Sequence, residues 1–245
     1  HLTMLKKNNF HNMPNIIVEF GPGNSIGIGL AALLCGAKEY IALDVVNRYD
    51  KKLNLEILDE LIVMFEEKKG VDKIGWPNYK NELDENNFPS SILSDAYLDK
   101  CLDKGRIQNI KDALLQGNNN EIKIHYISNN HNYSHIKADL IISHSVLEHV
   151  EDLDVTYDIF NEILIDGGYM SHQIDFKCHN LFNKWNGHWS ISDFLWKIIL
   201  GKRPFLINRS PVSIHVKYQN KYNFKIVELL KNYRYDGISR KKLSS

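Results

Sequence analysis

A strand, a glycine turn, a helix and a second strand follow one another near the N-terminus, and this pattern constrains the fold most. Residues 15–20 are rich in β-branched side chains and end at a glycine turn, which is typical of a buried parallel strand. Residues 25–34 have the apolar spacing of a helix, and residues 40–43 form a second strand that ends on Asp44. These elements predict a βαβ unit and therefore a parallel sheet.

The alternation of strands and helices resumes in the second half of the chain. We expect a helix at residues 155–164 and strands at residues 122–127, 138–143, 169–174 and 222–230. Together with the βαβ unit, these elements predict a Rossmann-like, doubly wound α/β fold, in which a mostly parallel sheet carries helices on both faces. We expect the 245 residues to form a single domain, residues 1–245.

Residues 50–120 interrupt the alternation after the second strand. Within them, residues 55–65 and 97–115 have helical spacing, whereas residues 76–79 (Trp-Pro-Asn-Tyr) are typical of a loop. We therefore predict a helical insertion that acts as a lid or a wall over the strand ends.

The glycine turn after the first strand is a candidate ligand site, because glycines let a ligand approach the backbone beside a helix N-terminus. Gly21, Gly23 and Gly27 do not have the GxGxxG spacing of a dinucleotide site. Glu19 would repel a pyrophosphate but attract the ammonium and sulfonium charges of S-adenosylmethionine. Asp44 can accept hydrogen bonds from ribose hydroxyls in either cofactor. The turn therefore favours S-adenosylmethionine over NAD.

Five segments resemble, in their order along the chain, the motifs of class I S-adenosylmethionine-dependent methyltransferases. They are residues 18–23 (VEFGPG), 42–45 (ALDV), 138–143 (ADLIIS), 146–150 (VLEHV) and 166–168 (DGG), and the resemblance covers about residues 15–175. Residues 172–175, 185–189, 203–204 and 208–209 resemble more loosely a bacterial branch associated with surface-polysaccharide (capsule and O-antigen) gene clusters.

The resemblance implies that the chain binds S-adenosylmethionine and releases S-adenosylhomocysteine. It assigns the methionine part to Glu19, Gly21 and Gly23, and the ribose to Asp44. The complete set of expected cofactor-binding residues is Glu19, Gly21, Pro22, Gly23, Asn24, Asp44, Val45, Ser143 and His144, with the last two near the sulfonium.

Four histidines, His144, His149, His172 and His179, cluster where the parallel strands should end, and candidates for proton transfer are found among them. Methyl transfer is an in-line displacement that depends mainly on positioning, but an alcohol acceptor must also lose a proton. A histidine suits this task at neutral pH. We expect the base among His172, His144 and His149, with Asp175 orienting a histidine or binding a hydroxyl directly. His149 can instead simply pack against or cap the following helix.

A metal is the alternative that we do not favour. Some class I methyltransferases bind a metal through Glu-x-x-Glu-His at this position, but here Ser145 replaces the first glutamate. Glu148, His149 and His172 would still offer three nitrogen or oxygen ligands. We expect no resident metal ion.

Residues 176–221 form an aromatic-rich segment that we assign to the acceptor side. Its aromatic side chains would cover the acceptor or stack on a sugar, although a core or a dimer seam explains them equally well. Its basic side chains would hold an anionic acceptor or lie in a solvated loop. The aromatic residues are Trp185, Trp189, Phe194, Trp196 and Tyr218, and the basic ones are Lys202, Arg203 and Arg209.

The charge balance limits the partners. Lys and Arg total 30, as do Asp and Glu, so the formal net charge is zero, which argues against general nucleic-acid or membrane-surface binding. The three cysteines form no CxxC pair, and no apolar run has the ~18 residues needed to span a bilayer. We expect a cytoplasmic protein, without membrane insertion, in which homo-oligomers remain an open alternative.

These observations favour methyl transfer to oxygen on a small-molecule acceptor. The acceptor would be a sugar, a nucleotide-sugar or a phosphorylated precursor in bacterial surface-glycan biosynthesis. Methylation of nitrogen, or of a phenol or quinone oxygen, is the other enzymatic reading. A non-enzymatic S-adenosylmethionine-binding partner without an acceptor site is the third.

Overall fold

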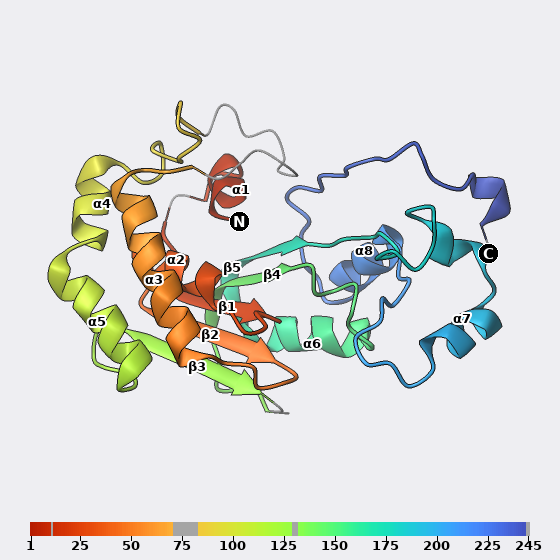
Figure 1. Ribbon diagram of the computed structural model, residues 1–245, viewed down its shortest axis with the longest axis horizontal. Coiled ribbons are helices and arrows are strands. Elements are labelled where there is room, and N and C mark those ends of the chain that lie inside the picture. The colour runs from red at the N-terminus through yellow and green to blue at the C-terminus, as the bar shows by residue number, and fades with distance from the viewer. Residues whose placement is uncertain (11, 71–82, 129–131, 244–245) are drawn as a thin grey trace. The chain divides into compact units, whose positions relative to one another are not determined.

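The computed structural model describes residues 1–10, 12–70, 83–128 and 132–243 (Figure 1). The chain divides into two compact units. The first unit consists of residues 1–143 and 162–171, and the second unit of residues 144–161 and 172–245. The glycine turn and Asp44 therefore belong to the first unit, and all the candidate proton-transfer residues belong to the second.

The first unit is built on a five-stranded sheet in the order β3-β2-β1-β4-β5. The strands are β1 (Ile16–Phe20), β2 (Glu39–Asp44), β3 (Lys123–Ser128), β4 (Ala138–His144) and β5 (Leu164–Gln173). β1 pairs in parallel with β2 and β4, β2 pairs in parallel with β3, and the arrows of β4 and β5 point the same way in Figure 1. This is the doubly wound order, with its switch point between β1 and β4, so the predicted fold class is confirmed.

Both faces of the central strands β1, β2 and β4 are largely apolar and buried, as expected for parallel strands in the middle of a sheet. One face packs against α2 (Gly27–Leu34), α3 (Lys51–Glu66) and α5 (Lys104–Leu115). The strand side chains of that face are Ile17, Tyr40, Ala42, Leu140 and Ile142, and those of the opposite face include Val18, Ile41, Leu43 and Ile141.

The predicted helical insertion after the second strand is confirmed, since α3, α4 (Asp95–Cys101) and α5 lie between β2 and β3. The predicted helix at residues 97–115 is two helices, because the Asp103 carboxylate accepts from the amides of Gly105 and Arg106 and starts α5 anew. The loop predicted at residues 76–79 lies outside the described residues. The lid role stays a prediction.

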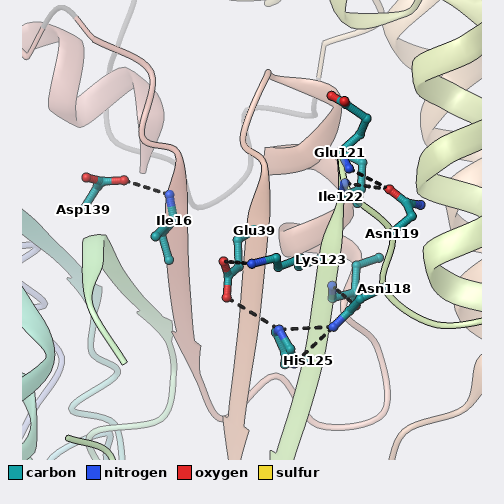
Figure 2. A network of polar contacts seen from close by, with 10 residues as sticks. Ile16, Glu39, Asn118, Asn119, Glu121, Ile122, Lys123, His125 and Asp139 are labelled. Atoms are coloured by element: carbon teal, nitrogen blue, oxygen red, sulfur yellow. Dashed lines mark hydrogen bonds and ion pairs between the residues drawn. The ribbon is translucent and has the colours of Figure 1, made fainter. Parts of the chain in front are cut away.

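The amino ends of the strands carry a separate network of polar contacts (Figure 2). The Asp139 carboxylate accepts from the amide of Ile16, the first residue of β1, at 2.8 Å. Glu39, at the start of β2, lies 3.8 Å from the Lys123 ammonium and 3.5 Å from His125 of β3. These contacts align the strand starts, and they lie at the opposite edge of the sheet from the glycine turn.

The second unit contains short helices and long irregular segments. Its elements are most of α6 (Leu153–Ile163), the 3-10 helix η1 (Gly187–Ser190), α7 (Asp193–Leu200), α8 (Val212–Lys221) and the 3-10 helix η2 (Arg240–Lys242). Cys178, Trp196 and Ile207 form a small core with Leu181, Phe182 and Leu206. Among the described residues, no helix is long and apolar enough to cross a membrane.

Two strand predictions need correction. The strand predicted at residues 222–230 is wrong: residues 224–230 follow α8 without pairing in the sheet, and Val227, Leu229 and Leu230 are exposed. Apolar alternation there has no neighbouring strand to pair with. The strand predicted at residues 169–174 begins five residues earlier, at Leu164.

Candidate functional site

The glycine turn leaves β1 in a conformation that favours glycine. Gly21 and Gly23 have φ angles of 68° and 69°, in the left-handed region that costs other residues about 1 kcal/mol or more. The amide of Gly21 donates to the carbonyl of Leu43 at 2.8 Å, which joins the turn to β2. A Cβ placed on Gly23 would meet no atom within 4 Å, so the backbone here faces open space that a ligand can occupy.

Asp44 ends β2 and binds the turn directly. Its Oδ2 accepts from the amide of Gly23 at 3.0 Å, and its Oδ1 accepts from the amide of Val46 at 3.1 Å. The Tyr126 hydroxyl, from β3, lies 3.3 Å from Oδ2 but only 2.8 Å from the Gly23 carbonyl oxygen. The Tyr126 hydroxyl has one proton, and the shorter distance indicates that it donates this proton to the Gly23 carbonyl oxygen. Asp44 therefore keeps acceptor capacity for two further donors, as a ribose diol requires.

Glu19 lies deeper than the sequence analysis assumed. It is 3% exposed, and its Oε2 accepts from the Tyr40 hydroxyl at 2.5 Å. Burial raises the pKa of Glu19 to about 7, and the bond from Tyr40 only partly opposes this. A cation close to Glu19 would favour its ionised form.

Two residues that the sequence analysis missed shape this edge of the sheet. Gly29, inside α2, packs on Tyr40, since a Cβ at this position would lie 2.3 Å from the Tyr40 ring. Asn54 of α3 is fully buried; its Oδ1 accepts from the amide of Ile26 at 2.9 Å and its Nδ2 donates to the Asn24 carbonyl at 3.3 Å. A glycine inside a helix and an asparagine on the apolar face of α3 are the sequence signals that mark them.

The other predicted cofactor residues differ in their exposure to solvent. Asn24 and Val45 are exposed, and Pro22 is half-buried. Ser143 is buried and pairs in register with Phe20 of β1. His144 is the first residue of the second unit and is exposed.

A cavity of the first unit lies away from the glycine turn. It has a volume of about 390 Å³, which is within the range of small-molecule pockets, but no residue of the glycine turn lines it. Its described lining residues are Leu2, Lys6, Phe10, Asn12, Met13, Ile92 and Tyr97. The described part of its lining includes no acid and no histidine.

In the second unit, Asn208 organises the loop that follows β4. Its side-chain amide donates to the carbonyls of Leu147 at 2.7 Å and Val150 at 2.9 Å, and its backbone amide donates to the carbonyl of Glu148 at 2.6 Å. Ser145, at the start of the loop, has a φ of 54°. The loop that carries Glu148 and His149 is therefore held by a residue some 60 positions away, which no local pattern predicts.

Asp175 lies near His179, although His172 is closer to it in the sequence. Its Oδ2 lies 3.0 Å from the Lys177 ammonium and 3.9 Å from Nε2 of His179. Burial opposes ionisation of Asp175, but the hydrogen bonds and charge of Lys177 lower its pKa below the usual value. Asp175 therefore pairs with Lys177 and lies near His179, and its role toward a histidine stays a prediction.

His172 stands in an apolar setting. Its ring stacks on Phe160 with a centroid separation of 5.0 Å and an interplanar angle of 16°. Burial lowers the pKa of His172 to about 3, with a smaller contribution from His215, so the ring is neutral at pH 7. The proton-transfer roles of His172, His144 and His149 stay predictions.

The aromatic and basic side chains of residues 176–221 divide into buried and exposed ones. Trp196 is buried, and the Trp189 indole donates to the Arg209 carbonyl at 2.7 Å, whereas Phe194 is 72% exposed. The Arg209 guanidinium donates to the Ile191 carbonyl at 2.9 Å and lies over the Trp196 ring at 5.3 Å. Arg209 therefore supports the fold of the second unit, and Lys202 and Arg203 are exposed.

No family model matches the sequence, and no curated protein matches it either. Among solved structures, (S)-3-hydroxybutyryl-CoA dehydrogenase PaaH1 from Ralstonia eutropha is 13% identical, with a TM-score of 0.30 over 66% of this chain and 41% of that one. Ribosomal protein L11 methylase from Lactobacillus delbrueckii subsp. bulgaricus is 16% identical, with a TM-score of 0.32 over 71% and 59%. E. coli MccB, crystallised with MccA, is 15% identical, with a TM-score of 0.29 over 90% and 60%. The chain thus spans between 41% and 60% of the length of these structures, and their likeness identifies no family.

Proposed function

We propose that this chain is an S-adenosylmethionine-dependent methyltransferase that acts on an oxygen of a small-molecule acceptor. The observation that carries the proposal is the junction of the glycine turn with Asp44 at the carboxyl end of β2. There the backbone of Gly23 faces open space, and Asp44 keeps free acceptor capacity beside it. In doubly wound sheets this edge is where ligands bind.

The residues fit the cofactor as follows. Asp44 would accept hydrogen bonds from the ribose hydroxyls, and the left-handed Gly21 and Gly23 would allow the ligand to approach the backbone. Glu19 would supply a negative charge toward the methionine part once it is ionised. When bound, S-adenosylmethionine supplies an activated methyl group on a cationic sulfur.

Methylation of an alcohol also requires removal of its proton. An alcohol acceptor requires a base, and His144, His149 and His172 remain the proposed candidates. Asp175, close to His179, would position a histidine or bind a hydroxyl. The finer assignment of the acceptor, as a sugar, nucleotide-sugar or phosphorylated precursor of a bacterial surface glycan, depends on the looser sequence resemblance alone.

Calorimetry with S-adenosylhomocysteine and with NADH tests the central claim. We expect one S-adenosylhomocysteine per chain and no comparable binding of NADH. Tight binding of NADH alone would contradict the proposal.

Transfer of a labelled methyl group separates the enzyme from a non-enzymatic partner that binds S-adenosylmethionine. We expect label to enter a pool of nucleotide-sugars or sugar phosphates. His144→Ala and His172→Ala should each reduce turnover at least about tenfold without changing the affinity for S-adenosylhomocysteine. Full activity of both variants would exclude these two bases.

A further inference from the structure

Three side chains of the second unit bring metal-ligating atoms together. One carboxylate oxygen of Glu148 and one ring nitrogen from each of His149 and His179 all lie within 4.8 Å of one another. We propose that Glu148, His149 and His179 form a binding site for one divalent first-row transition-metal ion, with Zn²⁺ as its probe. This site lies within the second unit and is independent of cofactor binding by the first unit.

Glu148 provides an unsatisfied buried acceptor. The residue is 4% exposed, and its Oε1 accepts from the amide of Asp175 at 3.2 Å. Its Oε2 is buried and has no hydrogen-bond partner among the residues that the structure describes. A buried carboxylate oxygen without a partner is unfavourable, and a bound cation would satisfy it.

The neighbouring chain fixes the orientation of His149. Its Nδ1 lies 2.8 Å from the carbonyl oxygen of Phe205. Because a carbonyl only accepts, Nδ1 must carry the proton and donate, which leaves Nε2 of the neutral ring with a lone pair. A hydrogen bond from one ring nitrogen to a backbone carbonyl is the usual support of a metal-ligating histidine. Phe205 itself has a φ of 61°, an unfavourable conformation for a bulky residue.

His179 completes the group from a strained turn. His179 and Asn180 have φ angles of 48° and 64°, so two consecutive residues other than glycine are left-handed. The His179 ring meets that of His149 edge to face at a centroid distance of 5.1 Å. Asp175 adds a carboxylate 3.9 Å from Nε2 of His179, and the Lys177 ammonium nearby is already paired with this carboxylate.

The ligand set selects the class of ion. Two imidazoles and one carboxylate suit Zn²⁺, Co²⁺ or Ni²⁺, whereas Mg²⁺ prefers oxygen ligands alone. A tetrahedral ion with bonds of about 2.0–2.1 Å would bring its ligand atoms to roughly 3.4 Å from one another. His179, with a side chain 36% exposed, has room to make this closing movement. Three protein ligands leave a further coordination position for water or an acceptor oxygen.

The structure changes the third ligand that the sequence analysis considered. His172 was the third ligand considered beside Glu148 and His149, but its ring stacks on Phe160. His179 lies 30 residues after His149, beyond any local metal-binding spacing.

Chelator-treated protein without an affinity tag is titrated with Zn²⁺ by calorimetry, and with Co²⁺ by visible absorption. We expect one ion per chain. His149→Ala, His179→Ala and Glu148→Gln should each weaken Zn²⁺ binding at least about tenfold. His135→Ala is the matched control, because His135 is an exposed histidine of the first unit. It should bind Zn²⁺ like the unaltered protein.

Circular dichroism of the metal-free variants separates folding from binding. Truncating His179, which is exposed, should leave the metal-free fold intact, so this variant decides the test even where Glu148→Gln does not fold. Absence of stoichiometric Zn²⁺ binding by the unaltered protein would overturn the proposal. So would unchanged affinity in His179→Ala, or an equal loss in His135→Ala. Binding of S-adenosylhomocysteine, measured on the same samples, separates this outcome from a failure of the proposed function.

Discussion

The two units differ in how many of their buried polar atoms have hydrogen-bond partners. In the first unit, Glu19 accepts from Tyr40, Asp44 accepts from Gly23, and Asn54 bonds the loop that follows the turn. Arg106 Nε is a buried atom of the first unit that has no hydrogen-bond partner among the described residues. More such atoms belong to the second unit; they include Glu148 Oε2, Trp185 Nε1, His188 Nδ1, Arg209 Nε and His215 Nε2. The first unit therefore presents a site organised by its own chain, whereas the second holds polar groups that a ligand, an ion or water would satisfy.

We expect acid to produce the largest difference between the two units. Lowering the pH should destabilise the second unit and stabilise the first. Burial lowers the pKa of His215 to about 4 and that of His172 to about 3. Below pH 6.5 the unfolded chain binds protons at these two histidines, whereas the folded chain keeps them neutral. The stability that the neutral histidines allow is therefore complete above that pH. It is lost as the pH falls toward 4, by about 3 kcal/mol for His215 alone. Glu148 offsets only part of this loss of stability. Burial raises its pKa to about 7, so the folded state binds the Glu148 proton more tightly than the unfolded chain does in acid.

The stability of the first unit should change with pH in the opposite direction. Burial raises the pKa of Glu19 to about 7, so its contribution to stability is complete below pH 4.5 and is lost as the pH rises through 7. Three of the four tryptophans, Trp185, Trp189 and Trp196, belong to the second unit, so tryptophan fluorescence in a Trp76→Phe background reports the unfolding of that unit. We expect this signal to be lost in acid before the helical circular dichroism, and His215→Phe should shift its midpoint to lower pH. Coincident transitions would contradict the comparison.

Among the single substitutions, we expect Asp44→Ala to reduce the affinity for the ligand most. Asp44→Ala removes the acceptor for two ribose hydroxyls and frees the Gly23 amide, so we expect the affinity for S-adenosylhomocysteine to fall about 100-fold, or roughly 3 kcal/mol. Glu39→Ala is the matched control, because Glu39 begins the same strand and belongs to the network at the other edge. Calorimetry of both variants measures the difference. An equal loss in the two variants would mean that Asp44 acts on the fold and not on the ligand.

Much of the first unit could be predicted from the sequence. The βαβ unit, the insertion and the four strands before β5 follow from apolar periodicity and glycine placement, because neighbours in sequence determine them. The roles of Tyr40, Asn54 and Asn208 depend on partners 21 to 61 residues away, and periodicity carries no such information. In the second unit, His179 and Phe205 are joined to His149 only through the fold.

Gly23 should show a smaller effect on the same ligand. Gly23→Ala meets no steric obstacle but must hold a left-handed φ of 69°, which costs about 1–2 kcal/mol and shifts the turn. We expect S-adenosylhomocysteine binding to weaken about tenfold. Gly117→Ala is the control, since Gly117 also has a positive φ, of 106°, and equally open surroundings. Both variants should lose similar thermal stability, and only Gly23→Ala should lose affinity.

We expect Glu19 to have the smallest effect on ligand affinity. This prediction tests whether Glu19, which is hydrogen-bonded to Tyr40, also interacts with the ligand. With a pKa of about 7, Glu19 is about half protonated at neutral pH in the free protein. A cationic ligand close to it favours the carboxylate, so the affinity for S-adenosylmethionine should rise up to about tenfold from pH 6 to pH 8, with release of a proton. Glu19→Gln, which still accepts from Tyr40, should bind with little dependence on pH. If the unaltered protein shows no such dependence, the Glu19 side chain serves only the packing against Tyr40, and the cationic part of the ligand lies elsewhere.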